Sequence, residues 1–170
     1  MNEALYRGFI RCNNDKTAAQ PYKEGEPLLT LEEAQKYDSY AGVMSDNTVM
    51  VDIDDSGHAE RLKRIIDAYD IKCRITRTRR GMHFTFFCND QLMNHNHVET
   101  AIGLIADYKY GINCSYEVLK IGGKEREVIA DPDMIQTTPR WLYPKSDEVI
   151  TANDSEYSSI VGLSQGSRDE

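Results

Sequence analysis

The sequence lacks the features that would place it in several common classes of protein. None of its apolar runs approaches the roughly 20 residues that a helix needs to cross a bilayer, so we expect a cytoplasmic protein without a membrane partner. Its first residues do not combine an apolar stretch with a small-residue cleavage site, so nothing there predicts secretion. The four cysteines stand singly, without the C-x-x-C spacing of a zinc site or a redox pair. We therefore predict reduced, buried thiols.

Positive charge is also scarce. The formal net charge of −8 argues against a protein that coats nucleic acid non-specifically, because affinity for phosphates comes from clustered Lys and Arg. A local basic groove is still compatible with this balance, since five of the 20 basic residues fall within residues 72–80 and no acidic residue lies among them. With 170 residues, 40% of them apolar, the chain can bury one good-sized core. We expect one folded domain over residues 1–145 and a polar, Ser-rich linker over residues 146–170.

Two helices are predicted. Thr30 and Glu33 have the spacing of a capping box, so a short helix should run from about residue 31 to residue 37. A longer amphipathic helix is predicted beyond Ser56, with Asp55 as its cap, because apolar residues recur there at helical spacing. These apolar positions are Ala59, Leu62, Ile65, Ile66 and Tyr69.

The extended segments outnumber the helices. Residues 40–44 and 48–54 are separated by turn residues and are predicted to pair as a hairpin. Residues 73–78 and 82–88 predict a second hairpin, whose return strand alternates apolar residues with His83 and Thr85. Residues 101–107, 115–121 and 125–130 predict an antiparallel meander. The expected fold class is therefore α/β (α+β), with a mixed or antiparallel sheet flanked by helices.

Two aspartates end the strand predicted at residues 48–54. Alternate side chains of a strand point to the same face, so Asp52 and Asp54 should lie together while Ile53 packs behind them. Two neighbouring carboxylates repel each other unless a hard cation intervenes, which predicts a site for Mg²⁺ or Mn²⁺. The structural alternative is an acidic strand end that caps the next helix, and it fits Asp55 well.

The tip of the second predicted hairpin combines arginines, a glycine and a histidine. Gly81 would let the backbone approach a phosphate, Arg80 would supply a planar cationic fork, and His83 begins the return strand. This pattern indicates an anion site, although a solvated basic turn with an incidental His is the plain alternative.

Two further segments contain ligand-type residues. Asp107 interrupts an apolar run much as Asp52 does, and it is the candidate for the third carboxylate that a two-metal site requires. A solvent-exposed Asp at a strand end is the alternative. His95 and His97 have the spacing of metal ligands, but they stand in an Asn-rich stretch without neighbouring Cys or acidic ligands, so we predict a loop there.

Together, these motifs resemble those of the archaeo-eukaryotic primase superfamily. The order is Asp-x-Asp on an apolar strand, then Thr78-x-x-Gly81-x-His83, then a later Asp107. The chain is most similar to the amino-terminal primase-polymerase domain of phage and plasmid replication primases. The likeness includes the phrases Tyr40-Ala-Gly-Val and Ser115-Tyr-x-Val-Leu-Lys120 and covers nearly all of residues 5–145.

The resemblance implies an RNA-recognition-motif-like catalytic module that joins nucleoside triphosphates on a single-stranded DNA template, with or without a primer. It implies that three carboxylates hold two divalent metals, and that Thr78, Arg80, Gly81, His83 and Lys120 bind the nucleotide. The metal ligands would be Asp52, Asp54 and Asp107, and His83 would join them in catalysis. It also implies that the protein acts in the cytoplasm of a bacterial host, and that a covalently linked helical and helicase region follows the linker.

Two other classes match part of the pattern. Haloacid-dehalogenase-like phosphatases also carry Asp-x-Asp after an apolar strand, but they need a parallel, doubly wound sheet, whereas the second half of this chain reads as antiparallel. A single-strand-binding domain of the RNA-recognition-motif type, without enzyme activity or with a degenerate site, is the other alternative. Arg80, Gly81, Phe84 and Phe87 match four positions of its second signature.

Overall fold

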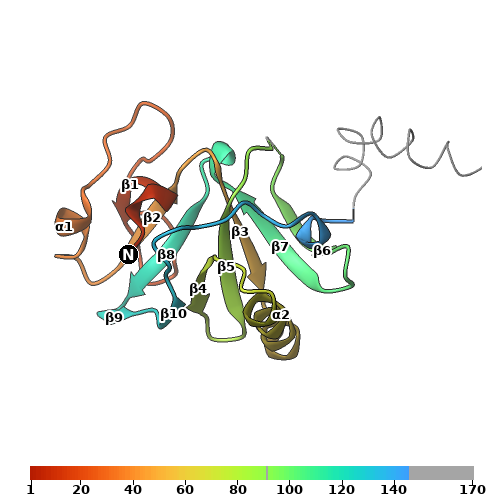
Figure 1. Cartoon of the computed structure of the whole chain (residues 1–170). Helices are drawn as coiled ribbons and strands as arrows, with labels where there is room; N and C mark the ends of the chain where they lie inside the picture. The colour runs from red at the N-terminus through yellow and green to blue at the C-terminus, as the bar shows by residue number, and fades with distance from the viewer. Residues whose placement is uncertain (91, 146–170) are drawn as a thin grey trace, which may run out of the picture.

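The computed structural model describes residues 1–90 and 92–145 and arranges their strands in two antiparallel sheets (Figure 1). The predicted linker lies outside the described residues. The smaller sheet has the order β1 (Tyr6–Arg11), β2 (Tyr40–Met44), β8 (Tyr116–Ile121) and β9 (Lys124–Glu125). The larger has the order β10 (Val128–Ala130), β4 (Arg74–Arg77), β5 (Met82–Phe87), β3 (Thr48–Ile53), β7 (Ile105–Tyr110) and β6 (His95–Glu99). The predicted α+β class is confirmed.

Helix α2 (Ser56–Ala68) packs on one face of the six-stranded sheet (Figure 1). It buries Ala59, Leu62 and Ile66 as its apolar spacing predicts, whereas Tyr69 falls after the last turn and is exposed. Asp55 is its N-cap, and the carboxylate accepts a hydrogen bond from the His58 backbone N–H at 2.8 Å. Asp55 therefore has a structural role as a helix cap, unlike Asp52 and Asp54, which were predicted to bind metal.

Helix α1 (Leu31–Ala34) is shorter than predicted, although its capping box between Thr30 and Glu33 is present. The other helical segments of residues 1–90 and 92–145 are single 3₁₀ turns: η1 (Glu3–Leu5), η2 (Gly111–Asn113) and η3 (Arg140–Leu142). The described residues contain no helix with the length and apolar character needed to span a membrane.

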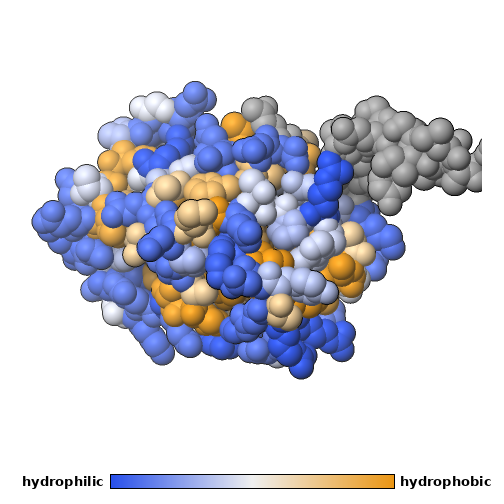
Figure 2. Space-filling view, in the orientation of Figure 1, coloured by the Kyte–Doolittle hydropathy of each residue, from blue (hydrophilic) through white to orange (hydrophobic). Residues whose placement is uncertain are grey.

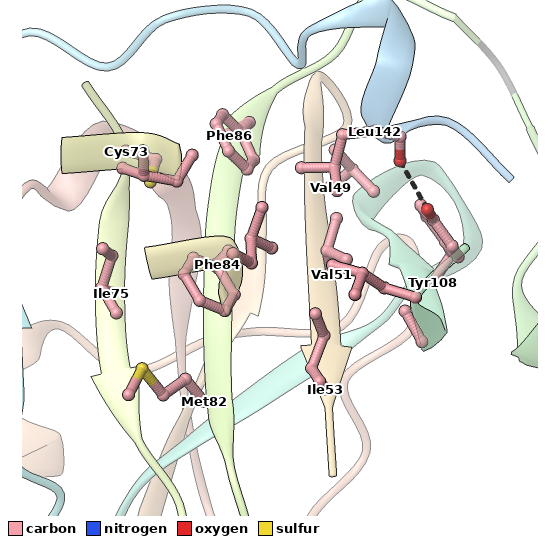
Figure 3. Packing of buried hydrophobic residues seen from close by; sticks show 14 of the residues in the cluster. Val49, Val51, Ile53, Cys73, Ile75, Met82, Phe84, Phe86, Tyr108 and Leu142 are labelled. Carbon is pink, nitrogen blue, oxygen red and sulfur yellow. Dashed lines mark hydrogen bonds between the residues drawn. The ribbon is translucent and has the colours of Figure 1, made fainter. Parts of the chain in front are cut away.

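Strand alternation separates the two faces of the six-stranded sheet. Apolar side chains of β3, β4, β5 and β7 point toward α2 and form the main core (Figure 3). On this face the Tyr108 hydroxyl donates to the Leu142 carbonyl, which ties η3 to the core. Phe87 points to the other face, where it packs against apolar residues of the four-stranded sheet. The face of the molecule seen in Figure 2 is mainly hydrophilic, and apolar residues reach it in separated patches.

Strand pairing differs from the predicted hairpins in two places. Strands β2 and β3 have nearly the predicted bounds, but β2 pairs with β1 and β8 while β3 pairs with β5 and β7, so the turn between them crosses from one sheet to the other. In the same way β8 leaves the sheet of β7, so the predicted meander is wrong there, and β8 and β9 are the only part of it that pairs as predicted. The hairpin of β4 and β5 is confirmed.

The stretch containing His95 and His97 is strand β6 rather than the predicted loop. It pairs with β7 at the edge of the sheet, and the register shifts between His95 and Val98. His97 has a positive φ of 54° within this irregularity, and its backbone N–H donates to the Asp107 carboxylate at 2.6 Å. The polar composition that favours a loop is accommodated because an edge strand is only half buried.

Candidate functional site

Three of the predicted site residues form one row across the six-stranded sheet. Asp52 on β3 lies directly opposite His83 on β5 and, on its other side, directly opposite Asp107 on β7. Residues paired in this way in antiparallel strands send their side chains to the same face. The row lies on the face away from α2, because Val51, next to Asp52, packs in the core below that helix. The fold therefore joins three motifs that are far apart along the chain.

The buried apolar residues of β3 and β7 determine the face to which the polar residues between them point. Val49, Val51 and Ile53 of β3 are fully buried beneath α2, so Asp52 must point the other way. On β7, Tyr108 is fully buried on the core side, which leaves Asp107 and Lys109 on the face of Asp52. The apolar partners thus determine which polar side chains meet.

His83 is held between two carboxylates. Its Nδ1 lies 3.0 Å from Oε1 of Glu117, which reaches in from β8 of the other sheet. Its Nε2 lies 3.5 Å from Oδ2 of Asp52. Burial by itself would lower the pKa of His83, but the contacts with Asp52 and Glu117 outweigh it and raise the pKa. The two anions thereby favour the charged form of the ring.

Both carboxylates in contact with His83 are stabilised in their charged form. Burial would raise the pKa of Asp52, but the hydrogen-bonding contact and charge of His83, with the charge of Lys109, lower it. Burial likewise opposes the charge of Glu117, yet His83, Arg74 and Thr76 together lower the pKa of Glu117 to about 2. A buried polar group of this kind is tolerable only because it is paired.

Sequence reasoning missed two residues of the site. The ammonium of Lys109 lies 3.6 Å from Oδ2 of Asp52, and its place two residues after Asp107 on the same strand was the available signal. Glu117 was overlooked because its position within Ser115-Tyr-x-Val-Leu-Lys120 carries no chemistry until β8 packs on the other sheet.

The second aspartate of the strand has a different environment from the first. Asp54 lies just beyond β3, is exposed, and forms an ion pair with Arg80 from the β4–β5 turn. This contact brings the predicted anion-binding turn to the end of the strand that carries Asp52. Thr78 stabilises the same turn, because its hydroxyl accepts a hydrogen bond from the Gly81 N–H at 3.0 Å.

Glycine is required at position 81 for a structural reason that the sequence did not reveal. A Cβ atom at this position would lie 1.7 Å from the carbonyl oxygen of Ile53. The requirement for glycine therefore comes from the close approach of the turn to strand β3, and it is not by itself an indication of a bound phosphate.

Lys120 does not join the row. Strand alternation places it on the opposite side of β8 from Glu117, and its ammonium lies 3.4 Å from the backbone carbonyl of Gln35. Of the residues predicted to bind nucleotide, it is the one that the fold separates from Asp52.

A cavity of about 460 Å³ opens beside Asp52 and His83, between the two sheets. Its wall combines cationic groups with amides, hydroxyls and tyrosine rings. The polar and aromatic lining comprises Lys16, Tyr22, Asn94, Asn96, Lys109, Asn113, Ser115, Tyr116 and Arg126. Tyr22 and Tyr116 meet edge to face, with ring centroids 5.2 Å apart. The space is large enough for a small polar ligand.

The carboxylates fit a cation that is held by few protein ligands. Oδ1 of Asp52 is buried and has no hydrogen-bond partner among the described residues, and Asp107 lies across the ladder from it. Within residues 1–90 and 92–145 no group of three His, Cys, Asp or Glu side chains is close enough to form a metal cage. Mg²⁺ commonly binds through one or two carboxylates, with water and phosphate oxygens completing its shell. Asp52 and Asp107 match this mode.

The chain was compared with models of protein families, with curated proteins and with solved structures, and none of the three comparisons found a match.

Proposed function

We propose that this domain is a metal-dependent nucleotidyltransferase of the primase-polymerase kind, which joins nucleoside triphosphates on a single-stranded DNA template. The observation that carries the proposal is the row formed by Asp107, Asp52 and His83 on one face of the sheet, beside a polar cavity. The row unites the three motifs of the resemblance in adjacent strands. A chance similarity of short motifs gives no reason for such a register.

In this proposal Asp52 and Asp107 would hold Mg²⁺ or Mn²⁺, and Asp54, which now pairs with Arg80, would be the third carboxylate of the site. The unpartnered Oδ1 of Asp52 is a free acceptor at the required place. When bound, the metals activate the attacking hydroxyl and stabilise the charge of the triphosphate. The residues of the chain supply position and charge for in-line attack of a 3′-hydroxyl on the α-phosphorus, which forms the new P–O bond and releases pyrophosphate.

The cationic residues around the row then serve the triphosphate. Lys109 lines the cavity and lies near Asp52, while Arg80 stands at the end of β3. Arg80 can exchange Asp54 for a phosphate group, because its ion pair with Asp54 is exposed and exposed ion pairs are weak. His83 directs Nδ1 toward Glu117 and Nε2 toward Asp52. In the proposal, Nε2 would contact a phosphate oxygen of the bound triphosphate.

Sheet topology supports the same proposal. Strands β3 and β4 are joined through α2, and β5 inserts between them, which is a split βαβ unit. With β7 on the other side of β3, the order β4-β5-β3-β7 resembles the sheet of an RNA recognition motif. There is also a departure, since the described part of the segment between β5 and β7 contains strand β6 and no helix.

The two alternatives have less support. The phosphatase reading needs a parallel sheet, whereas the ladders of both sheets are antiparallel. The single-strand-binding reading needs aromatic rings on the open face of the sheet. Phe84 is fully buried beneath α2, and Phe87 packs against the second sheet. In a longer protein, the proposed role is priming or strand synthesis in phage or plasmid replication, within the host cytoplasm and beside a linked helicase.

The test is incorporation of labelled ribo- or deoxynucleoside triphosphates on a single-stranded template, with and without a primer, in Mg²⁺ or Mn²⁺. We expect metal-dependent extension, and a fall of at least about 100-fold in Asp52→Asn. Asp46→Asn is the matched control, because Asp46 is exposed in the turn before the same strand. Equal activity of Asp52→Asn and the wild type would overturn the assignment. Metal-independent DNA binding without incorporation would favour the non-enzymatic alternative.

A further inference from the structure

Glu117 is the one buried acidic side chain of the described residues, and only 1% of it is exposed. It projects from β8 of the four-stranded sheet toward β4 and β5 of the six-stranded sheet. Removing a carboxylate from water costs several kcal/mol unless it is well paired. The hydrogen bonds of Glu117 show what offsets this cost.

Both oxygens of Glu117 are occupied. Oε2 accepts from the Tyr6 hydroxyl at 2.6 Å, and Oε1 accepts from the Thr76 hydroxyl at 2.7 Å. Oε1 also lies 3.0 Å from Nδ1 of His83. An ionised carboxylate is only an acceptor, so Nδ1 of His83 must carry the hydrogen. The ring thus presents Nδ1 to Glu117 and Nε2 to Asp52.

We propose that Glu117 is a positioning residue, which holds the His83 ring so that Nε2 faces Asp52 and the cavity. The orientation of the ring is the new claim, and its consequence for nucleotide transfer rests on the function proposed above. Two residues of the network allow the claim to be separated from a general role in joining the sheets. The side chains of Tyr6 and Thr76 also hydrogen-bond to Glu117, but neither side chain hydrogen-bonds to the His83 ring.

The test compares Glu117→Gln with Thr76→Val and Tyr6→Phe at one fixed neutral pH and without metal. Glutamine keeps the volume but offers one acceptor oxygen to three donors, so we expect the His83 Nδ1 to lose its hydrogen or the ring to turn. The nitrogen shifts of the ring, measured by NMR with labelled histidine, report this change. In the wild type and in both control variants, Nδ1 should remain protonated toward Glu117.

Incorporation kinetics provide the second readout. We expect kcat to fall at least about tenfold in Glu117→Gln, in line with other residues that orient a functional histidine, and by less than about threefold in Thr76→Val. An unchanged ring spectrum and unchanged kcat in Glu117→Gln would overturn the proposal, as would equal effects in all three variants. If the wild type incorporates no nucleotide, the proposed function fails while the NMR comparison still decides the positioning. If Glu117→Gln does not fold, a wild-type spectrum without hydrogen on Nδ1 would contradict the claim.

Discussion

Asp52 and Asp107 face one another directly across the ladder of β3 and β7. They do not form a bridge to each other: Oδ2 of Asp52 lies near His83 and Lys109, and Oδ1 of Asp107 accepts the His97 N–H. Two carboxylates on one face, each with capacity for a further partner, are an arrangement that a divalent cation stabilises.

Asp107→Asn should weaken Mn²⁺ binding on the order of tenfold or more, because one of few anionic ligands is lost. The amide oxygen still accepts the His97 N–H, so the melting temperature should stay close to that of the wild type. Calorimetric titration with Mn²⁺ measures the affinity. Asp46→Asn serves as the control, and an unchanged affinity in Asp107→Asn would remove this residue from the site.

Acid should destabilise the protein through Glu117. Its folded-state pKa of about 2 lies below the ordinary value of 4.5, so its contribution is present above pH 4.5 and is lost as the pH falls toward 2. The loss amounts to on the order of 3 kcal/mol of the free energy of unfolding. Urea unfolding at a series of pH values measures it. The slope in this window should flatten in Glu117→Gln, and an unaltered slope would assign the acid sensitivity to other groups.

Gly81→Ala should cost about 3 kcal/mol or more, since the new methyl group would meet the Ile53 carbonyl rather than a flexible side chain. The displaced strand end carries Asp52 and Asp54, so incorporation should fall as well. Gly122→Ala is the comparison: its Cβ meets nothing within 4 Å, and only the positive φ of 55° opposes it, at about 1–2 kcal/mol. Denaturant melts give both values, and equal losses would contradict the close-approach explanation.

Arg80→Gln should change substrate binding without changing stability. Both side chains of its ion pair with Asp54 are exposed, so the free energy of unfolding should change by less than about 1 kcal/mol. The KM for the nucleoside triphosphate should rise several-fold, because a cationic fork near the site is lost. Arg64→Gln on the exposed surface of α2 is the charge-matched control. Identical KM values in the two variants would separate Arg80 from the substrate.

The sequence by itself determined most of the local elements, with β6 as an exception, and the polarity of the β3 faces. Apolar alternation places Asp52 opposite in direction to Val51 and Ile53, and a capping residue at Asp55 begins α2 as predicted. The pairing of β4 with β5 followed from their short turn. These features depend on neighbours in the chain, whose spacing is visible in the residues themselves.

Only the tertiary structure decided which strands meet. Both β2 and β3 are apolar enough to be central strands, so their composition could not tell a hairpin from a crossing between sheets. The same long-range pairing brings Glu117 to His83 and sends Lys120 away from Asp52. A one-residue change in strand register reverses the face of every side chain, so the membership of the site depends on packing between distant segments.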